Sequence, residues 1–324
     1  MNIVICTPSK EEIEFFSSKF PGENIRFFNK NLDAEILEQI SDSEIFSGRI
    51  YSKVNEEVLE KLPKLKYIVT HSTGYDHIDI EACQKKGVAV LNVPSYGERS
   101  IAEFVFGLIL ALVKNIHRVD CKVQKMDFDT SDLDGIEIFG KTLGVIGTGK
   151  IGKEVVKIGK GLGMEILAFD LYEDEQFAKE NNLEYVSLDE LLKKSDIVSL
   201  HVPHLENTHH LMNGENFSKM KNGAYFINTA RGAVVDSEAL LEALKSQKLK
   251  GVALDVVEYE KILFSKEERL EAVEQAFKEL KKYNVLYTPH MAAHSLEAQA
   301  KKLEIIAENI SSCLKGSPIN AIHN

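Results

Sequence analysis

The stretch TLGVIGTGKIGKEVVKIGKGLGMEILAFD, residues 142–170, decides the fold. It contains a short apolar run at 143–146, three glycines in the spacing GxGxxG, a segment with helical periodicity, and a second apolar run at 164–169 followed by an acid. Short apolar runs on either side of an amphipathic segment predict two parallel strands joined by a helix. The chain therefore contains at least one β-α-β unit with a glycine-rich first turn.

Each glycine of this turn has a distinct physical role if the ligand is a dinucleotide. Gly147 permits the tight turn out of the first strand, Gly149 lets the backbone approach a pyrophosphate, and Gly152 lets the helix pack closely against the strand. The first helical residues, Lys150 and Ile151, present N–H groups and the positive end of the helix dipole to phosphates. An ordinary β-α-β turn is the alternative, since glycine turns are common.

Asp170 favours the dinucleotide site because it stands at the end of the second strand, 18 residues after Gly152. A carboxylate there accepts hydrogen bonds from both ribose hydroxyls of an adenosine and repels a 2′-phosphate. The two residues that follow supply no arginine to neutralise such a phosphate, so NAD, rather than NADP, is the predicted cofactor. A phosphate-binding P-loop is excluded, because GxxxxGK at 144–150 is followed by Ile151 where that loop needs Ser or Thr for magnesium.

The length and charge of the chain limit its partners. With 324 residues it exceeds the roughly 100–200 residues of a typical domain, so two cores are expected. The net charge of -11 argues against non-specific binding to nucleic acid or to an anionic membrane. Any anionic ligand must therefore be held by a local site.

Export and membrane insertion are not expected. The first residues, MNIVICTPSKEE, have no basic segment before their apolar run and predict a strand rather than a signal peptide. The most apolar stretch, 101–113, contains Glu103 and is shorter than the ~20 residues of a membrane span, which favours a buried helix. Four cysteines without a CxxC pair are typical of a reduced chain, and we expect a cytoplasmic protein.

Two regions alternate strand-like and helical segments, which predicts parallel sheets covered by helices. In the first 95 residues the strand candidates are 3–6, 25–28, 45–46, 67–70 and 88–91, with helical segments at 34–40 and 56–61. Beyond 170, strands are expected at 197–202, 224–228, 252–256 and 285–288, and helices at 187–194, 237–246, 265–282 and 295–314. The expected fold class is α/β with two doubly wound parallel-sheet domains, one of them a Rossmann NAD-binding domain.

Two segments lie between these regions. Ser100 and Glu103 match the SxxE capping box, so a helix is predicted to begin at Ser100. Because apolar residues surround it on most sides, we expect burial all round, at a domain junction or a subunit interface. The polar segment 120–140 contains Asp127, Asp129, Asp132 and Asp134 but lacks the glycine and terminal glutamate of a calcium loop at the right places, which favours a solvated connector.

Three side chains follow predicted strands of the cofactor domain: Arg231 after YFINTA, Glu260 after VALDVVEY and His290 after VLYTP. An arginine can bind a substrate carboxylate through its rigid fork and polarise the neighbouring carbonyl. A histidine can donate a proton near neutral pH, and a carboxylate on its other ring nitrogen raises its pKa. Reduction of a 2-oxo acid needs this set, although each residue also has a structural alternative as a salt bridge, a solvated acid or a cap.

An ordered set of motifs resembles one family over nearly the whole chain. STGYDHID, NVPSYGERSIAE, VIGTGKIG with Asp170, LHVP, FINTARGAVVD, ALDVVEYE and LYTPH together resemble the D-isomer-specific 2-hydroxyacid dehydrogenases. The resemblance implies that Arg231 binds the substrate carboxylate, His290 is the acid/base and Glu260 is its partner. It also implies that Thr73 and Gly74 offer backbone N–H groups to the carboxylate and that Tyr96 lies by the substrate.

The same resemblance implies the cofactor site and the architecture. Expected cofactor contacts are Gly147, Thr148, Gly149, Lys150, Ile151, Gly152, Asp170, His201, Val202, Pro203, Thr208, Thr229, Ala230, Arg231, Asp255 and His290. A Rossmann domain, residues 95–290, is expected to be inserted into a flavodoxin-like substrate domain made of 1–94 and 291–324. The resemblance further implies a homodimer.

The substrate is expected to be a small 2-oxo or 2-hydroxy acid. The TGYDHID loop, Tyr96 and the long insert between Glu260 and His290 resemble the D-lactate dehydrogenase branch, which makes reduction of pyruvate to D-lactate the leading hypothesis. That branch carries aromatic residues shortly after the histidine, whereas this chain has Met-Ala-Ala-His-Ser at 291–295. Hydroxypyruvate, glyoxylate and branched or aromatic 2-oxo acids therefore stay open, as does a non-catalytic NAD-sensing, corepressor-like protein.

A histidine-rich loop needs a separate interpretation. His201, His204, His209 and His210 lie within ten residues and include Glu206 between them, so a metal site can be imagined. The resemblance places His201 beside the cofactor ribose and the others on a polar loop. We therefore expect no bound metal.

Overall fold

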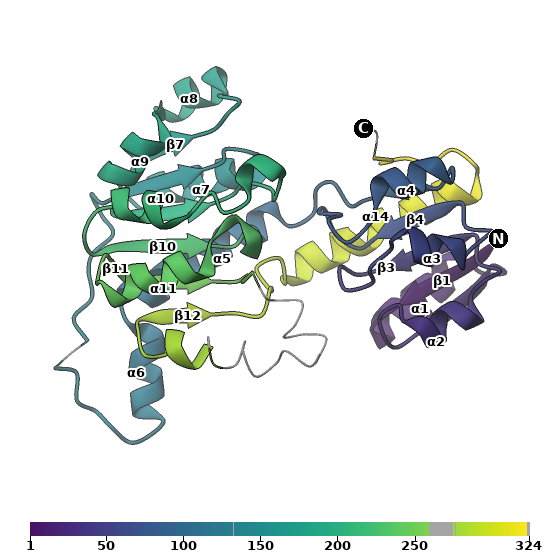
Figure 1. Ribbon diagram of the computed structural model, residues 1–324, viewed down its shortest axis with the longest axis horizontal. Coiled ribbons are helices and arrows are strands. Elements are labelled where there is room, and N and C mark those ends of the chain that lie inside the picture. Colours follow the sequence, from purple (N-terminus) through teal and green to yellow (C-terminus); the bar gives the residue numbers. More distant parts are fainter. Residues whose placement is uncertain (132, 259–274, 276, 323–324) are drawn as a thin grey trace. The chain divides into compact units, whose positions relative to one another are not determined.

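The chain forms two compact units (Figure 1). The structure is a computed structural model that describes residues 1–131, 133–258, 275 and 277–322. Unit 1 consists of Met1–Gly97 and Ser295–Asn324, and unit 2 consists of Glu98–His294. Unit 1 is therefore discontinuous in sequence, and unit 2 is inserted into it.

Unit 1 is built on a sheet of five parallel strands in the order β2-β1-β3-β4-β5. The strands are β1 (Asn2–Cys6), β2 (Asn24–Phe28), β3 (Ile45–Gly48), β4 (Tyr67–Thr70) and β5 (Ala89–Leu91). This is the flavodoxin-like order, in which chain direction across the sheet reverses between β1 and β3. The carboxyl ends of β1 and β3 therefore form the topological switch point of unit 1, where open α/β sheets bind ligands.

Helices cover both faces of this sheet, which explains why its central strands are apolar on both sides. One face is covered by α1 (Lys10–Lys19) and α14 (Leu296–Leu314), and the other by α2 (Ala34–Gln39), α3 (Glu56–Glu60) and α4 (Ile80–Lys85). In Figure 1, α14 is coloured yellow beside the purple and blue strands. A helix from the end of the chain thus covers a sheet formed by the beginning of the chain.

Unit 2 is built on seven parallel strands in the order β12-β11-β10-β9-β6-β7-β8. They are β6 (Thr142–Ile146), β7 (Glu165–Phe169), β8 (Glu184–Tyr185), β9 (Ile197–Leu200), β10 (Ala224–Asn228), β11 (Leu249–Leu254) and β12 (Val285–Tyr287). Counted from β6, this is the Rossmann order with one additional strand, and the switch point lies between β6 and β9.

The helices of unit 2 also form two layers. One layer contains α5 (Glu98–Val113), α7 (Lys150–Gly161) and α8 (Glu175–Asn181), and the other α9 (Leu188–Lys194), α10 (Gly214–Lys219) and α11 (Ser237–Lys245). A further helix, α6 (Ile116–Val123), and the short 3-10 turns Glu206–Thr208 and Gly232–Val234 lie in the connections. The prediction of two doubly wound α/β domains is confirmed.

Two local predictions are wrong. Ser100 does not cap a helix, because α5 begins earlier, at Glu98, and the Ser100 hydroxyl donates a hydrogen bond to the carbonyl of Ala292 at 3.1 Å. The polar segment 120–140 is not wholly a connector, since α6 extends to Val123. Most of the helix predicted at 265–282 lies outside the described residues.

The apolar helix α5 buries one side in the core of unit 2, while Glu103 and Gly107 on its other side are exposed. Within unit 2, α5 is therefore not buried on all sides, contrary to the expectation from its sequence. Among the described residues, no single helix combines the length and apolarity needed to cross a membrane, and α5 with α6 meets the criterion only as a pair bent by 63°.

Candidate active site

Six of the predicted site residues lie along one edge of the sheet of unit 2. Carboxyl ends of parallel strands share one edge, so the strand order fixes the order of the residues that follow the strands. From β12 across to β7 the edge carries, in turn, His290, Asp255, Arg231, His201, Gly147 and Asp170. Residues separated by up to 143 positions in sequence thus form one continuous row.

The glycine-rich turn at this edge is sterically restricted at two positions and open at the third. Gly147 has a φ of +93°, and a β-carbon there would lie 2.6 Å from the carbonyl oxygen of His201. A β-carbon on Gly152 would lie 2.0 Å from the carbonyl oxygen of Gly147. At Gly149, which precedes the first residue of α7, an added β-carbon would meet no described atom within 4 Å. This open space at a helix N-terminus fits a pyrophosphate.

Asp170 is tied to the turn by Thr148. One carboxylate oxygen of Asp170 accepts hydrogen bonds from the Thr148 backbone N–H at 2.6 Å and from its hydroxyl at 3.1 Å. The other oxygen accepts the N–H of Tyr172 at 2.9 Å. Thr148 is buried and its hydroxyl also lies 2.8 Å from that of Tyr185. Thr148 therefore fixes the acid at the end of β7, where the ribose hydroxyls of NAD are expected.

Other predicted cofactor contacts differ in what their side chains do. The buried Thr229 hydroxyl has no hydrogen-bond partner among the described residues, so it is free to bind a ligand. Thr208, in contrast, donates to the carbonyl of Pro203 at 2.7 Å and accepts the N–H of Leu205 at 2.7 Å. Its hydroxyl shapes the loop. Lys150 and Pro203 are exposed, while Ile151, Val202 and Ala230 are partly buried.

His201 is a neutral histidine beside the switch point. Its Nε2 lies 2.9 Å from the hydroxyl of Ser199 on the adjoining strand β9. The residue as a whole is partly exposed, but desolvation of its ring lowers the pKa to about 3. His201 therefore adds no positive charge to the cofactor site near neutral pH.

Arg231 stands on a turn held by Asn228. The Asn228 amide donates to the carbonyl of Arg231 at 3.0 Å, and its oxygen accepts the N–H of Ala230 at 2.9 Å. A β-carbon on Gly232 would lie 2.1 Å from the carbonyl carbon of Val257, so this turn is pressed against the segment after β11. Asn228 was not among the predicted site residues, although an asparagine that ends a buried apolar strand is a recognisable signal for such a turn.

Asp255 builds the turn that carries His290. Its fully buried carboxylate accepts hydrogen bonds from the Thr288 hydroxyl at 2.6 Å and from the N–H groups of Met291 and Ala292, both at 2.9 Å. His290 is half-buried and has a φ of +53°, which is uncommon for a residue with a side chain. Three charge-assisted bonds thus fix an unusual backbone conformation at the predicted acid/base. Glu260 lies outside the described residues.

The predicted substrate contacts Thr73, Gly74 and Tyr96 belong to unit 1. Thr73 donates its hydroxyl to the carbonyl of Val93 at 2.7 Å, and its own carbonyl accepts the amide of Asn92 at 2.7 Å. Within the described residues, neither the N–H of Thr73 nor that of Gly74 donates a hydrogen bond. Two backbone donors after β4 are thus available to a carboxylate.

The histidine-rich loop forms a chain of contacts, not a cluster of ligands. His204 and His209 are joined by a ring-nitrogen contact of 3.2 Å, and His209 stacks on His210 with ring centroids 4.0 Å apart. His210 Nε2 lies 2.7 Å from a carboxylate oxygen of Glu258. Among the described residues, no three His, Cys, Asp or Glu side chains are arranged to hold a metal ion.

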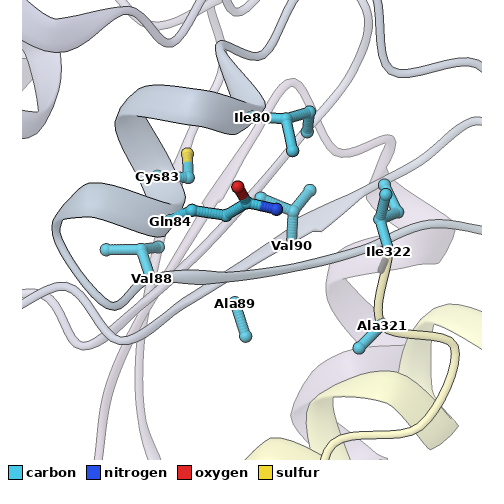
Figure 2. Close-up of a pocket in the computed structure, with 8 residues that line it drawn as sticks. All are labelled: Ile80, Cys83, Gln84, Val88, Ala89, Val90, Ala321 and Ile322. Carbon is cyan, nitrogen blue, oxygen red and sulfur yellow. The ribbon is translucent and has the colours of Figure 1, made fainter. Parts of the chain in front are cut away.

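A separate hollow in unit 1 offers little chemistry (Figure 2). It lies between α4, β5 and the end of the chain, and its lining is apolar except for the amide of Gln84 and the thiol of Cys83. Burial raises the pKa of Cys83 to about 11, so this thiol is not a nucleophile near neutral pH.

The sheet order and glycine turn of unit 2 define a dinucleotide-binding Rossmann domain. Residues 106–292 match the model of the D-isomer specific 2-hydroxyacid dehydrogenase, NAD binding domain. The chain belongs to the D-isomer-specific 2-hydroxyacid dehydrogenase family, and its cofactor is NAD.

Relatives of this chain differ in the substrates that their names give. It is 36% identical over 299 residues to D-lactate dehydrogenase from Escherichia coli, and the alignment covers 91% of this chain and 91% of that relative. It is 39% identical over 283 residues to D-3-phosphoglycerate dehydrogenase from Methanocaldococcus jannaschii, covering 87% of this chain but only 52% of that relative. The structure of D-lactate dehydrogenase from Aquifex aeolicus with NAD and lactic acid has a TM-score of 0.90 and 37% identity, covering 98% of this chain and 96% of that one.

Proposed function

We propose that this chain reduces a small 2-oxo acid to the D-2-hydroxy acid, with pyruvate as the leading substrate and unit 1 as the substrate domain. The observation that carries the proposal is the row of residues along unit 2. Arg231 and His290 follow β10 and β12, on either side of β11, and the same edge continues to the glycine turn of β6. The groups proposed to bind the substrate, donate the proton and bind the cofactor thus follow strands of one sheet, which supports the proposal.

Each residue has a defined part in the reaction. NADH, when bound, supplies a hydride to the carbonyl carbon. The electron pair of the carbonyl π bond moves to its oxygen, which takes a proton from the imidazolium of His290. Arg231 holds the carboxylate, while the free N–H groups of Thr73 and Gly74 are two further donors for it. By family resemblance, Glu260 stabilises the imidazolium.

The turn after β12 bears on the choice of substrate. Ala292 is buried and its N–H is bonded to Asp255, so the segment that follows His290 is held through its backbone and has alanines at 292 and 293. The aromatic residues expected of the D-lactate branch are absent from 291–295. Pyruvate leads because of the D-lactate dehydrogenase relatives, and hydroxypyruvate, glyoxylate and branched or aromatic 2-oxo acids are the alternatives.

The test is a turnover assay of the purified chain. Loss of NADH absorbance would be followed with pyruvate, glyoxylate, hydroxypyruvate, 2-oxoisocaproate and phenylpyruvate, and the best substrate repeated with NADPH. We expect His290→Ala to lower kcat by about 10²- to 10⁴-fold with NADH binding retained. His117→Ala, on α6 and outside the predicted site residues, is the control and should keep its turnover. Equal activity of both variants would refute the assignment of His290, and NADH binding without turnover of any acid would favour the NAD-sensing alternative.

We further propose a cytoplasmic homodimer, on the strength of the family resemblance and the partly exposed apolar helix α5. Light scattering on the eluted peak of a size-exclusion column gives the mass in solution, and a mass equal to one chain of 36.4 kDa would refute the dimer.

A further inference from the structure

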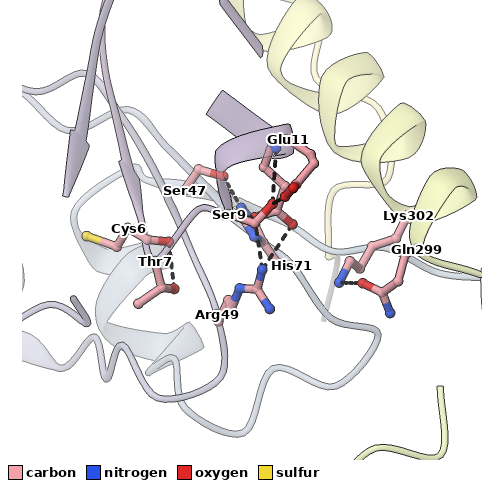
Figure 3. Close-up of polar contacts among 10 residues, drawn as sticks. Cys6, Thr7, Ser9, Glu11, Ser47, Arg49, His71, Gln299 and Lys302 are labelled. Carbon is pink, nitrogen blue, oxygen red and sulfur yellow. Dashed lines mark hydrogen bonds and ion pairs between the residues drawn. The ribbon is translucent and has the colours of Figure 1, made fainter. Parts of the chain in front are cut away.

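The acid expected at the adenosine ribose, Asp170, is held by neutral groups. The three hydrogen bonds that it accepts from described residues come from the backbone N–H and hydroxyl of Thr148 and from the N–H of Tyr172. Figure 3 shows a different arrangement at the switch point of unit 1, where a guanidinium nitrogen of Arg49 lies 2.9 Å from a carboxylate oxygen of Glu12. That carboxylate is paired with a cation, whereas the donors at Asp170 fix the acid and leave its negative charge in place.

The groups around Asp170 form a chain of hydrogen bonds with a single direction. A hydroxyl has one proton, and the hydroxyl of Thr148 donates its proton to Asp170 at 3.1 Å. The Thr148 oxygen must therefore accept at its 2.8 Å contact with the hydroxyl of Tyr185 on β8. Tyr185 in turn accepts the backbone N–H of Asp174 at 3.3 Å. Every donor thus points along one path, from Asp174 through Tyr185 and Thr148 to the carboxylate.

The first member of this chain, Asp174, is anchored to two helices. Its carboxylate caps α8 by accepting the N–H of Phe177 at 2.9 Å. The other carboxylate oxygen forms an ion pair with Lys153 on α7, the helix that begins at the glycine-rich turn. The ring of Tyr185 packs against the hydrophobic core of unit 2. Both groups that precede Thr148 in the chain are therefore held in place by the fold.

The bond from Tyr185 determines where the Thr148 hydroxyl points. Threonine has three staggered χ1 positions, and a buried hydroxyl favours the position that provides hydrogen-bond partners. Thr148 is 4% exposed, and in the observed rotamer its hydroxyl has both an acceptor, Asp170, and a donor, Tyr185. Removal of the Tyr185 hydroxyl takes away one of these partners, so the preference for this rotamer becomes weaker.

The position of the acid bears on which dinucleotide binds. A 2′-phosphate brings negative charge to the place where NAD has a hydroxyl, and a carboxylate there repels it. The repulsion is relieved if the carboxylate turns away, which costs the hydrogen bonds that hold it. We propose that Tyr185, acting through Thr148, is a positioning residue that keeps Asp170 in place and thereby excludes dinucleotides with a 2′-phosphate. Asp170 supplies the charge, and the other two residues prevent it from moving aside.

Cofactor binding tests this proposal without any 2-oxo acid, so the result does not depend on the proposed function. Fluorescence titrations give the Kd of NADH and of NADPH, and the quantity compared is the Kd of NADPH divided by the Kd of NADH. We expect this ratio to be at least about 100 in the wild type. It should fall roughly three- to tenfold in Tyr185→Phe and about 10- to 100-fold in Thr148→Val, which loses a hydrogen bond to a charged group.

Two control variants accompany these titrations. Thr148→Ser keeps the hydroxyl and should retain the ratio of the wild type. Tyr283→Phe removes the hydroxyl of another half-buried tyrosine of unit 2 and should leave both Kd values unchanged. A purely structural role of Tyr185 and Thr148 would weaken NADH and NADPH binding by the same factor. An unchanged ratio in Tyr185→Phe and Thr148→Val, or a ratio near one in the wild type, refutes the proposal.

The double variant shows whether Tyr185 acts through Thr148. Once the Thr148 hydroxyl is absent, loss of the Tyr185 hydroxyl should have no further effect on the position of the acid. We therefore expect Tyr185→Phe combined with Thr148→Val to have the same ratio as Thr148→Val alone. Effects of the two substitutions that multiply in the double variant would contradict a path through Thr148.

Discussion

The two units place different chemistry at the switch points of their sheets. At the switch point of unit 2, the residues are glycines and backbone N–H groups at the start of α7, with open space at Gly149. At the switch point of unit 1, the residues are Glu12, Arg49 and Lys302, whose charged groups lie on long side chains. A cofactor that never changes suits a site made of backbone, whereas a site made of side chains can be altered by single substitutions.

The largest effect is expected from a substitution that disturbs the glycine-rich turn of unit 2. In Gly152→Ala the new methyl group would lie 2.0 Å from a backbone oxygen, so α7 must shift away from β6. We expect NADH affinity to fall at least 100-fold and stability to fall by about 1–3 kcal/mol. Gly161→Ala, at the end of the same helix with no described atom within 4 Å of the new methyl, should bind normally and gain about 0.5–1 kcal/mol. Fluorescence titration with NADH compares the affinities of the two variants. Similar affinities would show that NADH binding does not depend on the close packing at Gly152.

A smaller effect is expected where unit 2 does use a buried charge. Asp255→Asn replaces an acceptor by a donor that faces an N–H group of the turn carrying His290. We expect stability to fall by about 1–3 kcal/mol and kcat by roughly 10²-fold, because His290 is displaced. NADH affinity should stay within a few-fold of the wild type. Unchanged kcat would mean that Asp255 does not position the acid/base.

The smallest effect concerns one histidine in each unit, His71 and His201, whose Nε2 lies within hydrogen-bond distance of a serine hydroxyl. The folded pKa of His71, about 3, lies below its ordinary value of 6.5. Between pH 6.5 and pH 3 this histidine is protonated in the unfolded chain but neutral in the folded chain. The stability present above pH 6.5 is therefore lost as the pH falls toward 3, by at most about 1.4 kcal/mol per pH unit. His71→Gln keeps a hydrogen-bonding group near Ser47 and cannot titrate. Urea unfolding at pH 7 and pH 5 should show a smaller loss of stability in the variant, and identical losses would contradict the assignment.

Local patterns in the sequence predicted the fold well where local physics decides it. The glycine turn, the apolar strands and the helices predicted at 187–194 and 295–314 each depend on a few consecutive residues, and each is present. Ser100 shows the limit of this reasoning. Its SxxE pattern is a sound cap signal, but its hydroxyl bonds a carbonyl 192 residues away, and no local pattern contains that partner.

The sequence predicted those site residues that closely follow a strand. Arg231 and His290 were expected from the strands before them, and strand order then explains why they share an edge. The roles of Asn228 and Asp255 in holding the turns depend on contacts that only the fold creates. The burial of Lys302 did have a signal, since this residue stands four residues before the buried Ile306 and four after the buried Ala298, on the apolar stripe of α14.

The discontinuity of unit 1 has a consequence for biosynthesis. Asn309 on α14 bonds the carbonyl of Asn92, 217 residues earlier, and α14 covers the sheet face that contains Ile3, Ile45 and Val69. At about 5–20 residues per second, the ribosome needs roughly 10–40 s to translate from one partner to the other. Throughout that interval the nascent sheet has an apolar face that α1 covers only in part, while the inserted unit can already fold. Vectorial synthesis therefore completes the cofactor-binding half first, and places the greatest demand for chaperones on the half that emerged earliest.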